Sequence, residues 1–140
     1  MTDRGGAPLA GRHTAANVNE GTVLVRLVDA IPALRQPRGR PGRPRRRPAK
    51  LHAAKASASR ANRAALRRRH ITPRIARPKV DSSERLGRYR WVAERSFAWL
   101  HRHRRLLLRY ERRADRHQAF LDLGAALICW QLLAHVHHDL

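Results

Sequence analysis

Arginine is the residue type that gives this chain its greatest capacity for chemistry. The 140 residues contain 31 Lys and Arg against ten Asp and Glu, a formal net charge of +21, and all but three of these cations are arginine. The planar guanidinium can donate two hydrogen bonds at once to phosphate oxygens, whereas a lysine ammonium acts as a point charge. A GC-rich coding sequence would raise arginine over lysine, but it leaves the shortage of acids unexplained. Because a chain this cationic attracts polyanions, nucleic acid is the expected partner.

The arginines gather in two places, a loop at 35–48 and a segment that follows Glu94. The loop alternates Arg with Pro and Gly, so neither a helix nor a central strand is expected there. Its two Gly-Arg-Pro repeats, at 39–41 and 42–44, are similar to the core of an AT-hook, which lies in the minor groove; a solvated basic linker is an equally good interpretation. The candidate DNA contacts are Arg38, Arg40, Arg43, Arg45, Arg46, Arg47, Arg90, Arg102, Arg104, Arg105 and Arg109, with Arg112 and Arg113 beside them.

Carboxylates and histidines give weaker indications of a binding or metal site than the arginines do. Glu94 follows Arg90 by four residues, a spacing that gives only a weak ion pair on a helix. His101 and His103 are two residues apart and point away from each other on a helix, and Cys129 is expected to be buried. A zinc site is therefore disfavoured. The remaining histidines weighed as zinc ligands are His117, His135, His137 and His138.

The elements that must position these residues alternate between strand and helix. Arg4-Gly5-Gly6 is a turn signal, and a hairpin is expected around it. Apolar residues from Val23 to Ile31 repeat at helical spacing, which predicts a short amphipathic helix ended by Pro32. After the basic loop, we expect a strand within 49–57, a basic helix at 60–69, a strand at 71–75, a helix from the N-cap serines at 82–83 to about 103, and a last helix at about 116–136. This order is an α/β pattern.

Apolar positions on the two C-terminal helices mark an expected core. Ala93, Phe97 and Leu100 share one face with Leu86, and the helical spacing of Trp91, Phe97 and Trp99 assigns the aromatic residues to the core as well. The residues of the last helix expected to face inward are Phe120, Leu123, Leu127 and Ile128. Buried aromatics could not stack on bases, which counts against the alternative of a non-enzymatic basic protein that binds nucleic acid.

The segment Arg90-Trp91-Val92-Ala93-Glu94-Arg95-Ser96-Phe97-Ala98-Trp99-Leu100 resembles the Arg-x-x-x-Glu helix of bacterial insertion-sequence transposases with a ribonuclease-H-like DDE domain. Further segments are similar to the same family, so the resemblance covers nearly the whole chain. They are Asn17, Leu27 to Pro32, Gly39 to Leu51, Tyr110 to Asp115 and Ala126 to Trp130. The resemblance implies an α/β, ribonuclease-H-like fold. We expect it to be incomplete, with residues 1–140 forming the C-terminal part of a catalytic domain that has short strands and a long C-terminal helical region.

The resemblance implies three carboxylates that hold two Mg²⁺ ions for cutting and joining DNA. Glu94 matches the third carboxylate, and it is the one metal ligand expected here if a partner complements it. Ala54 occupies the position of the second Asp and has no oxygen for a metal. The first Asp is expected to lie on a strand before Met1. Since Ala56 to Ala58 also depart from the pattern, and each change needs only one base, we interpret the cluster as decay of the reading frame or a sequence error.

These observations predict a DNA-binding transposase that is truncated and catalytically inactive. Its partners are expected to be DNA and either an upstream transposase half or further copies of itself. Mg²⁺ belongs to the family, but we expect none on this chain. The apolar run at 119–136 carries Asp122, Gln131 and His135, which suit a buried helix better than a membrane span. With a single cysteine and an N-terminus that lacks an apolar signal, a cytoplasmic location is expected.

Overall fold

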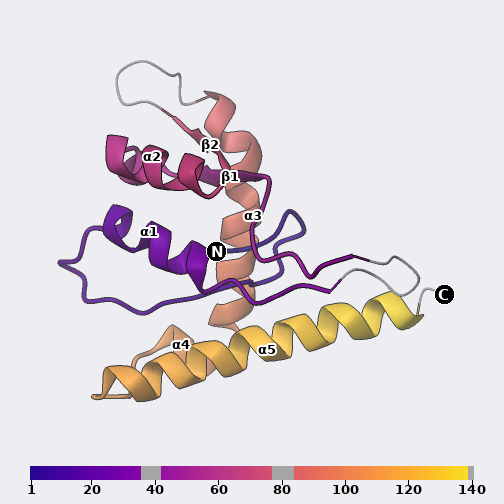
Figure 1. Ribbon diagram of the computed structural model, residues 1–140. Helices are drawn as coiled ribbons and strands as arrows, with labels where there is room; N and C mark the ends of the chain where they lie inside the picture. Colours follow the sequence, from indigo (N-terminus) through magenta and orange to yellow (C-terminus); the bar gives the residue numbers. More distant parts are fainter. Residues whose placement is uncertain (36–41, 77–83, 139–140) are drawn as a thin grey trace. The chain divides into compact units, whose positions relative to one another are not determined.

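The computed structural model describes residues 1–35, 42–76 and 84–138, and the chain forms two compact units (Figure 1). One unit is Ala15–Gly87, and the other combines Met1–Thr14 with Arg88–Leu140. The predicted mixture of helices and strands is confirmed. In chain order, the elements are α1 (Glu20–Asp29), β1 (Lys50–Ala53), the 3₁₀ helix η1 (Lys55–Ser57), α2 (Arg60–Arg68), β2 (Thr72–Ile75), α3 (Glu84–His101), α4 (Arg104–Leu107) and α5 (Ala114–His138).

Strands β1 and β2 pair in parallel, with Leu51 opposite Pro73, and lie side by side in Figure 1. A parallel pair needs a crossover connection, and the basic helix α2 provides it. The strand predicted within 49–57 ends earlier, at Ala53. It ends there because the chain turns into η1, where the Ser57 N–H donates to the Ala54 carbonyl at 3.0 Å.

The core of the unit Ala15–Gly87 is built from one apolar face of each element. The amphipathic helix predicted before Pro32 is confirmed as α1, and its residues Leu24 and Val28 are buried. Asn19 caps this helix, since its side-chain oxygen accepts from the Gly21 N–H at 2.8 Å. The remaining buried apolar residues of the unit are Ile31, Leu51, Ala65, Leu66, Ile71, Ile75 and Ala76.

The buried amide of Asn62 joins three elements of this unit. Its Nδ2 donates to the Gly21 carbonyl of α1 at 2.8 Å and to the Ser57 carbonyl of η1 at 3.2 Å. The approach of η1 to α1 requires glycine, because a Cβ at position 21 would lie 2.7 Å from the Ala56 carbonyl oxygen. Asn62 therefore links the start of α1 and the end of η1 to α2 through two buried hydrogen bonds.

Helix α2 ends in a Schellman motif. His70 lies in the left-handed region at φ 59°, its N–H donates to the Arg67 carbonyl at 2.9 Å, and the Ile71 N–H donates to the Leu66 carbonyl at 3.0 Å. The side chains of Leu66 and Ile71 are both fully buried, which supplies the apolar contact that accompanies this motif. The turn therefore closes α2 and directs the chain into β2.

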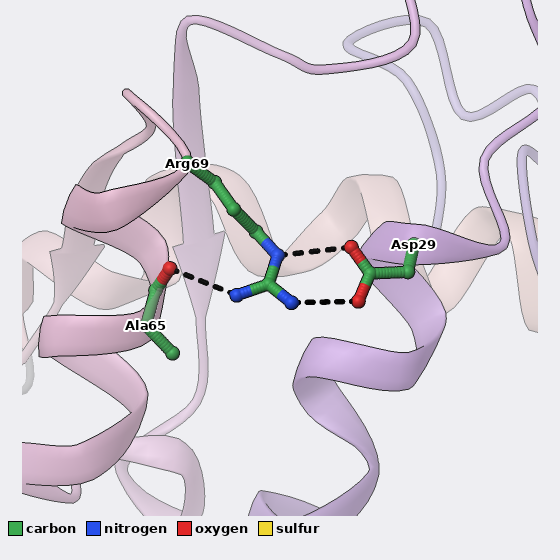
Figure 2. Close-up of polar contacts among 3 residues, drawn as sticks. All are labelled: Asp29, Ala65 and Arg69. Carbon is green, nitrogen blue, oxygen red and sulfur yellow. Dashed lines mark hydrogen bonds and ion pairs between the residues drawn. The ribbon is translucent and has the colours of Figure 1, made fainter.

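An ion pair joins the end of α1 to the end of α2 (Figure 2). The guanidinium of Arg69 donates from Nε to Asp29 Oδ1 at 2.9 Å and from Nη2 to Asp29 Oδ2 at 2.7 Å, and its Nη1 donates to the Ala65 carbonyl at 3.1 Å. These hydrogen bonds, helped by the positive charges of Arg69 and Arg47, hold the pKa of the Asp29 carboxyl below its usual value. Both side chains remain partly exposed to solvent.

In the second unit, a tight turn at the N-terminus is held against α3. Asp3 accepts from the Ala7 N–H at 2.8 Å, and Gly6 adopts φ 90°, so the predicted turn is confirmed. The hairpin expected around it is reduced to one antiparallel bridge between Thr2 and Pro8. The buried Ser96 hydroxyl of α3 donates to the Gly6 carbonyl at 2.7 Å.

The side chain of Gln118 on α5 binds the backbone of the N-terminal segment. Its Oε1 accepts from the His13 N–H at 2.8 Å, and its Nε2 donates to the Gly11 carbonyl at 3.0 Å. The His13 ring also meets the buried His117 ring edge-on, with centroids 4.7 Å apart. Burial, together with the charge of Arg109 and the proximity of His117, lowers the pKa of His13.

The core predicted for the last two helices is largely wrong. Ile128 is buried, but Leu123 and Leu127 of α5 are 56% and 43% exposed, and Phe97 of α3 is 60% exposed. Within this unit, polar side chains bind backbone carbonyls, and Leu121 and Leu106 lie close to Gly11 and Gly124. A periodic apolar pattern cannot reveal contacts of either kind.

Two further expectations about this unit need revision. The helix predicted to reach residue 103 ends at His101, and the short helix α4 that follows it was not predicted. Cys129 is half-buried rather than buried; its thiol lies 3.5 Å from the Pro8 carbonyl, and burial raises its pKa. Among the residues that the structure describes, no helix is both long and apolar enough to cross a membrane. The N-cap expected at residues 82–83 lies outside the described residues.

Replacing His70 by glycine is expected to stabilise the chain. The left-handed conformation costs a residue with a Cβ about 1 kcal/mol, and His70 is exposed, so little packing should be lost. Urea unfolding of His70→Gly should therefore give a higher free energy of unfolding. His70→Val is the matched control and should lower it. Equal stability of the two variants would contradict the assignment of the motif.

The ion pair of Asp29 should make stability depend on pH in the acid range. The pKa of Asp29 is lowered in the folded chain. The ion pair therefore adds to the free energy of unfolding above the ordinary carboxyl pKa, and this stabilisation is lost as the pH falls through the lowered pKa. Asp29→Asn is therefore expected to be less stable than the parent chain at neutral pH, and this difference should shrink on acidification. Denaturant unfolding at several pH values measures it, with Arg69→Gln as control. A difference that stays constant with pH would show that the pair does not act in this way.

Candidate nucleic-acid interface

The described part of the basic loop presents arginines to solvent. Arg43, Arg45, Arg46 and Arg47 are all exposed, and together with Ala33 and Pro44 they line an open hollow of about 600 Å³. The base of the loop is closed by an antiparallel bridge, in which Leu34 and Arg45 exchange backbone hydrogen bonds of 2.8 and 2.9 Å. This bridge positions the arginines that follow it. Arg38 and Arg40, predicted as contacts in the same loop, lie outside the described residues.

Helix α2 adds a cationic surface that was predicted as a basic helix but not as a DNA contact. Arg60, Arg67 and Arg68 are exposed, whereas Ala65 and Leu66 on the opposite side are buried. The helix contains no acid, and Ser59 caps its N-terminus by accepting from the Asn62 N–H at 3.0 Å. The signal in the sequence was the spacing of Arg60 and Arg67, which places them on one side of a helix.

The arginines after α3 are exposed as predicted, but three of them also make contacts within their own unit: Arg105, Arg109 and Arg113, the last in an ion pair with Asp115 at 2.7 Å. Arg105 forms an ion pair with Glu111 at 2.6 Å and lies over the ring of Phe120 at 5.0 Å. The Nε of Arg109 donates to the Glu111 carbonyl at 3.1 Å. The other predicted contacts of this group that are exposed are Arg102, Arg104 and Arg112. The side chain of Arg90 lies outside the part of the structure that is described.

The predicted Mg²⁺ site needs several carboxylate side chains close together. Glu94 is exposed on α3, in the unit that contains Arg88–Leu140, and Ala54 is exposed directly after β1, in the unit Ala15–Gly87. A methyl group offers no oxygen to Mg²⁺, which prefers carboxylate ligands. Over residues 1–35, 42–76 and 84–138, no group of three or more His, Cys, Asp or Glu is placed to hold a metal ion. The described residues therefore do not fit a pair of Mg²⁺ ions.

The aromatic residues of α3 are not in the core to which the sequence assigned them. Trp91 is 50% exposed and Phe97 is 60% exposed. The guanidinium carbon of Arg95 lies 4.6 Å from the centre of the Trp91 ring and 5.0 Å from that of Trp99. The helical period was correct, but the indoles pack on an arginine rather than on apolar neighbours. Aromatic and cationic side chains are therefore interleaved on this helix, an arrangement typical of surfaces that bind single strands.

Comparisons with known proteins identify relatives of this chain. A family model described as Transposase DDE domain matches residues 1–130. A Burkholderia cepacia protein named "Putative transposase for insertion sequence element IS402" is 49% identical over 140 residues, which are 100% of this chain and 65% of that protein. The chain thus spans less than two thirds of the length of this relative. No solved structure matches the chain significantly.

Proposed function

The chain belongs to the family of transposase DDE domains, and on this basis we propose that it binds DNA through its exposed arginines but does not cut DNA by itself. The observation that carries the binding proposal is the run Arg43 to Arg47, which lines an open hollow without a single acidic side chain. Guanidinium groups in such an arrangement suit the regularly spaced phosphates of a DNA strand. The exposed arginines of α2 belong to the same unit and extend the cationic surface available to DNA.

The absence of cutting rests on the residue at position 54. When two Mg²⁺ ions are held in a DDE site, one activates the attacking water and the other stabilises the leaving oxygen. Those ions need shared carboxylates, and Ala54 supplies none. Glu94 alone cannot organise two ions. Under this proposal, cutting would require another polypeptide, such as an upstream transposase half or a further copy, to supply the carboxylates.

The family also supports a proposal about architecture and location. We assign the parallel pair β1–β2 and its crossover helix α2 to a ribonuclease-H-like fold, because strands joined through a helix are the repeating unit of such α/β sheets. We also propose that residues 1–140 belong to a single DDE catalytic domain. A chain that binds chromosomal DNA in a bacterium would work in the cytoplasm.

DNA binding should be strongly dependent on salt and independent of sequence. If about six to ten phosphates are neutralised, the affinity should fall roughly 10³- to 10⁵-fold between 50 and 200 mM salt. Replacing Arg43, Arg45, Arg46 and Arg47 by Gln should reduce the slope of log Kd against log salt by about three to four. Fluorescence anisotropy with a labelled duplex measures this slope. The fourfold Lys variant keeps the charge and should keep the slope, whereas a flat response of the parent chain would refute DNA binding.

The purified chain should show no Mg²⁺-dependent nicking of a supercoiled plasmid that carries insertion-sequence ends. The reason is the missing carboxylate at position 54. Glu94→Ala should give the same result as the parent chain. Ala54→Asp serves as a folding control, because position 54 is exposed and the substitution should leave the chain folded. Nicking by the parent chain that disappears in Glu94→Ala would show that the site is active.

A further inference from the structure

The N-terminal segment, residues 1–13, is fastened to α3 and α5 by hydrogen bonds from side chains. The Ser96 hydroxyl of α3 holds its first turn. At its other end, Gln118 of α5 accepts from the His13 N–H at 2.8 Å and donates to the Gly11 carbonyl at 3.0 Å. A segment fastened by a few bonds of this kind can open at a lower cost in free energy than the unfolding of its whole unit.

The ring of His13 lies against a second histidine. Its centroid is 4.7 Å from that of His117, and the two planes meet at 71°, which is an edge-on contact. His117 is buried, and its Nδ1 has no hydrogen-bond partner among the residues that the structure describes. Two neutral rings in this arrangement attract each other. The contact therefore joins the end of the N-terminal segment to a side chain in the interior of the unit.

The surroundings of the His13 ring disfavour its charged form. Burial is the largest of three causes that lower its pKa, and the charge of Arg109 and the proximity of His117 are the other two. Arg109 comes from the segment between α4 and α5, and His117 comes from α5. All three causes act in the same direction, so a proton on His13 weakens the closed arrangement.

The two carboxylates of α5 are engaged with other partners. Asp115 forms an ion pair with Arg113 at 2.7 Å, and Asp122 accepts a hydrogen bond from Gln118 Nε2 at 2.9 Å. The groups that act on the charge of His13 are therefore a guanidinium and a second imidazole rather than an acid.

We propose that His13 is a pH-sensitive switch, which keeps the N-terminal segment on α5 while its ring is neutral and releases the segment when the ring takes up a proton. This switch goes beyond the proposed function and does not depend on DNA binding. In the released segment, the ring is solvated and no longer lies near the charge of Arg109. The released segment therefore binds a proton more readily than the closed one, and acid shifts the population toward release.

The pH range of release follows from the direction in which the pKa is shifted. Because the pKa of His13 is lowered in the closed segment, the segment is held most firmly above the ordinary histidine pKa of about 6.5. It loosens as the pH falls from that value toward the lowered one, by at most about tenfold per pH unit for one proton. The ion pair of Asp29 belongs to the other unit and is lost only below the ordinary carboxyl pKa, so the two effects occupy separate pH ranges.

Cys129 reports whether the segment is closed, because it is the single cysteine of the chain and its thiol lies 3.5 Å from the Pro8 carbonyl. Its rate of reaction with a dipyridyl disulfide is measured from about pH 7.5 to 5.5, in the folded chain and in the chain unfolded by urea. The ratio of the two rates gives the protection of the thiol. This protection should fall severalfold in the parent chain as the pH is lowered. His13→Phe keeps a ring but does not titrate, so its protection should stay constant.

His135→Phe is the matched control, because it removes an exposed histidine of the same helix and should follow the parent chain. If His13→Phe does not fold, His13→Asn takes its place, with a protection that is lower than that of the parent chain at neutral pH but constant. An equal fall in the parent chain and in the His13 variant would overturn the proposal. So would a parent protection that does not change with pH, or none at neutral pH. Since no DNA is present, the result is independent of the test of the proposed function.

Discussion

Thirty-one cationic side chains share ten carboxylates in this chain, and this imbalance governs how it can fold. Most arginines must either remain in solvent or find oxygen acceptors other than carboxylates. Backbone carbonyls take that role where an arginine lies inside a unit: Arg63 donates to Ile75 at 2.6 Å, Arg69 to Ala65, and Arg95 to Gly5. Each such contact satisfies a carbonyl and helps to hold a guanidinium in place, although Arg69 also pairs with Asp29. The arginines that remain exposed form the surface that we propose binds DNA.

Close approach of backbone segments at glycine residues is the second feature that stabilises the interior of each unit. Gly21 allows η1 to reach α1, and Asn62 then bridges their carbonyls. Gly6 allows the N-terminal turn to reach α3, where Ser96 donates to its carbonyl. In both places a small buried polar side chain donates to a glycine carbonyl. These contacts are short-range and directional, so they specify one arrangement within each unit where an apolar surface alone would permit several.

The excess of cationic over acidic side chains also explains why the proposed function includes DNA binding but not DNA cutting. Binding a polyanion needs positive charge, which the chain has in excess, whereas two-metal chemistry needs carboxylates close together, which the described residues do not provide. Glu94 retains its position on a long helix beside exposed aromatics. The proposed function therefore assigns DNA binding, but not cutting, to this chain.

The sequence by itself predicted most of the element types, the basic loop and the family, and the family resemblance implies a carboxylate at the position that Ala54 occupies. Helical periodicity, Pro and Gly punctuation, and single residue identities are local properties, and α1, α2, β2 and the long helices follow from them. The tertiary structure alone decided which faces are buried. Trp91, Phe97 and Leu127 have the spacing of core residues, yet they are exposed, whereas the polar Ser96 is buried and donates to the Gly6 carbonyl. Such contacts join residues 90 positions apart in Ser96 and Gly6 and 107 positions apart in Gln118 and Gly11, and no local pattern encodes them.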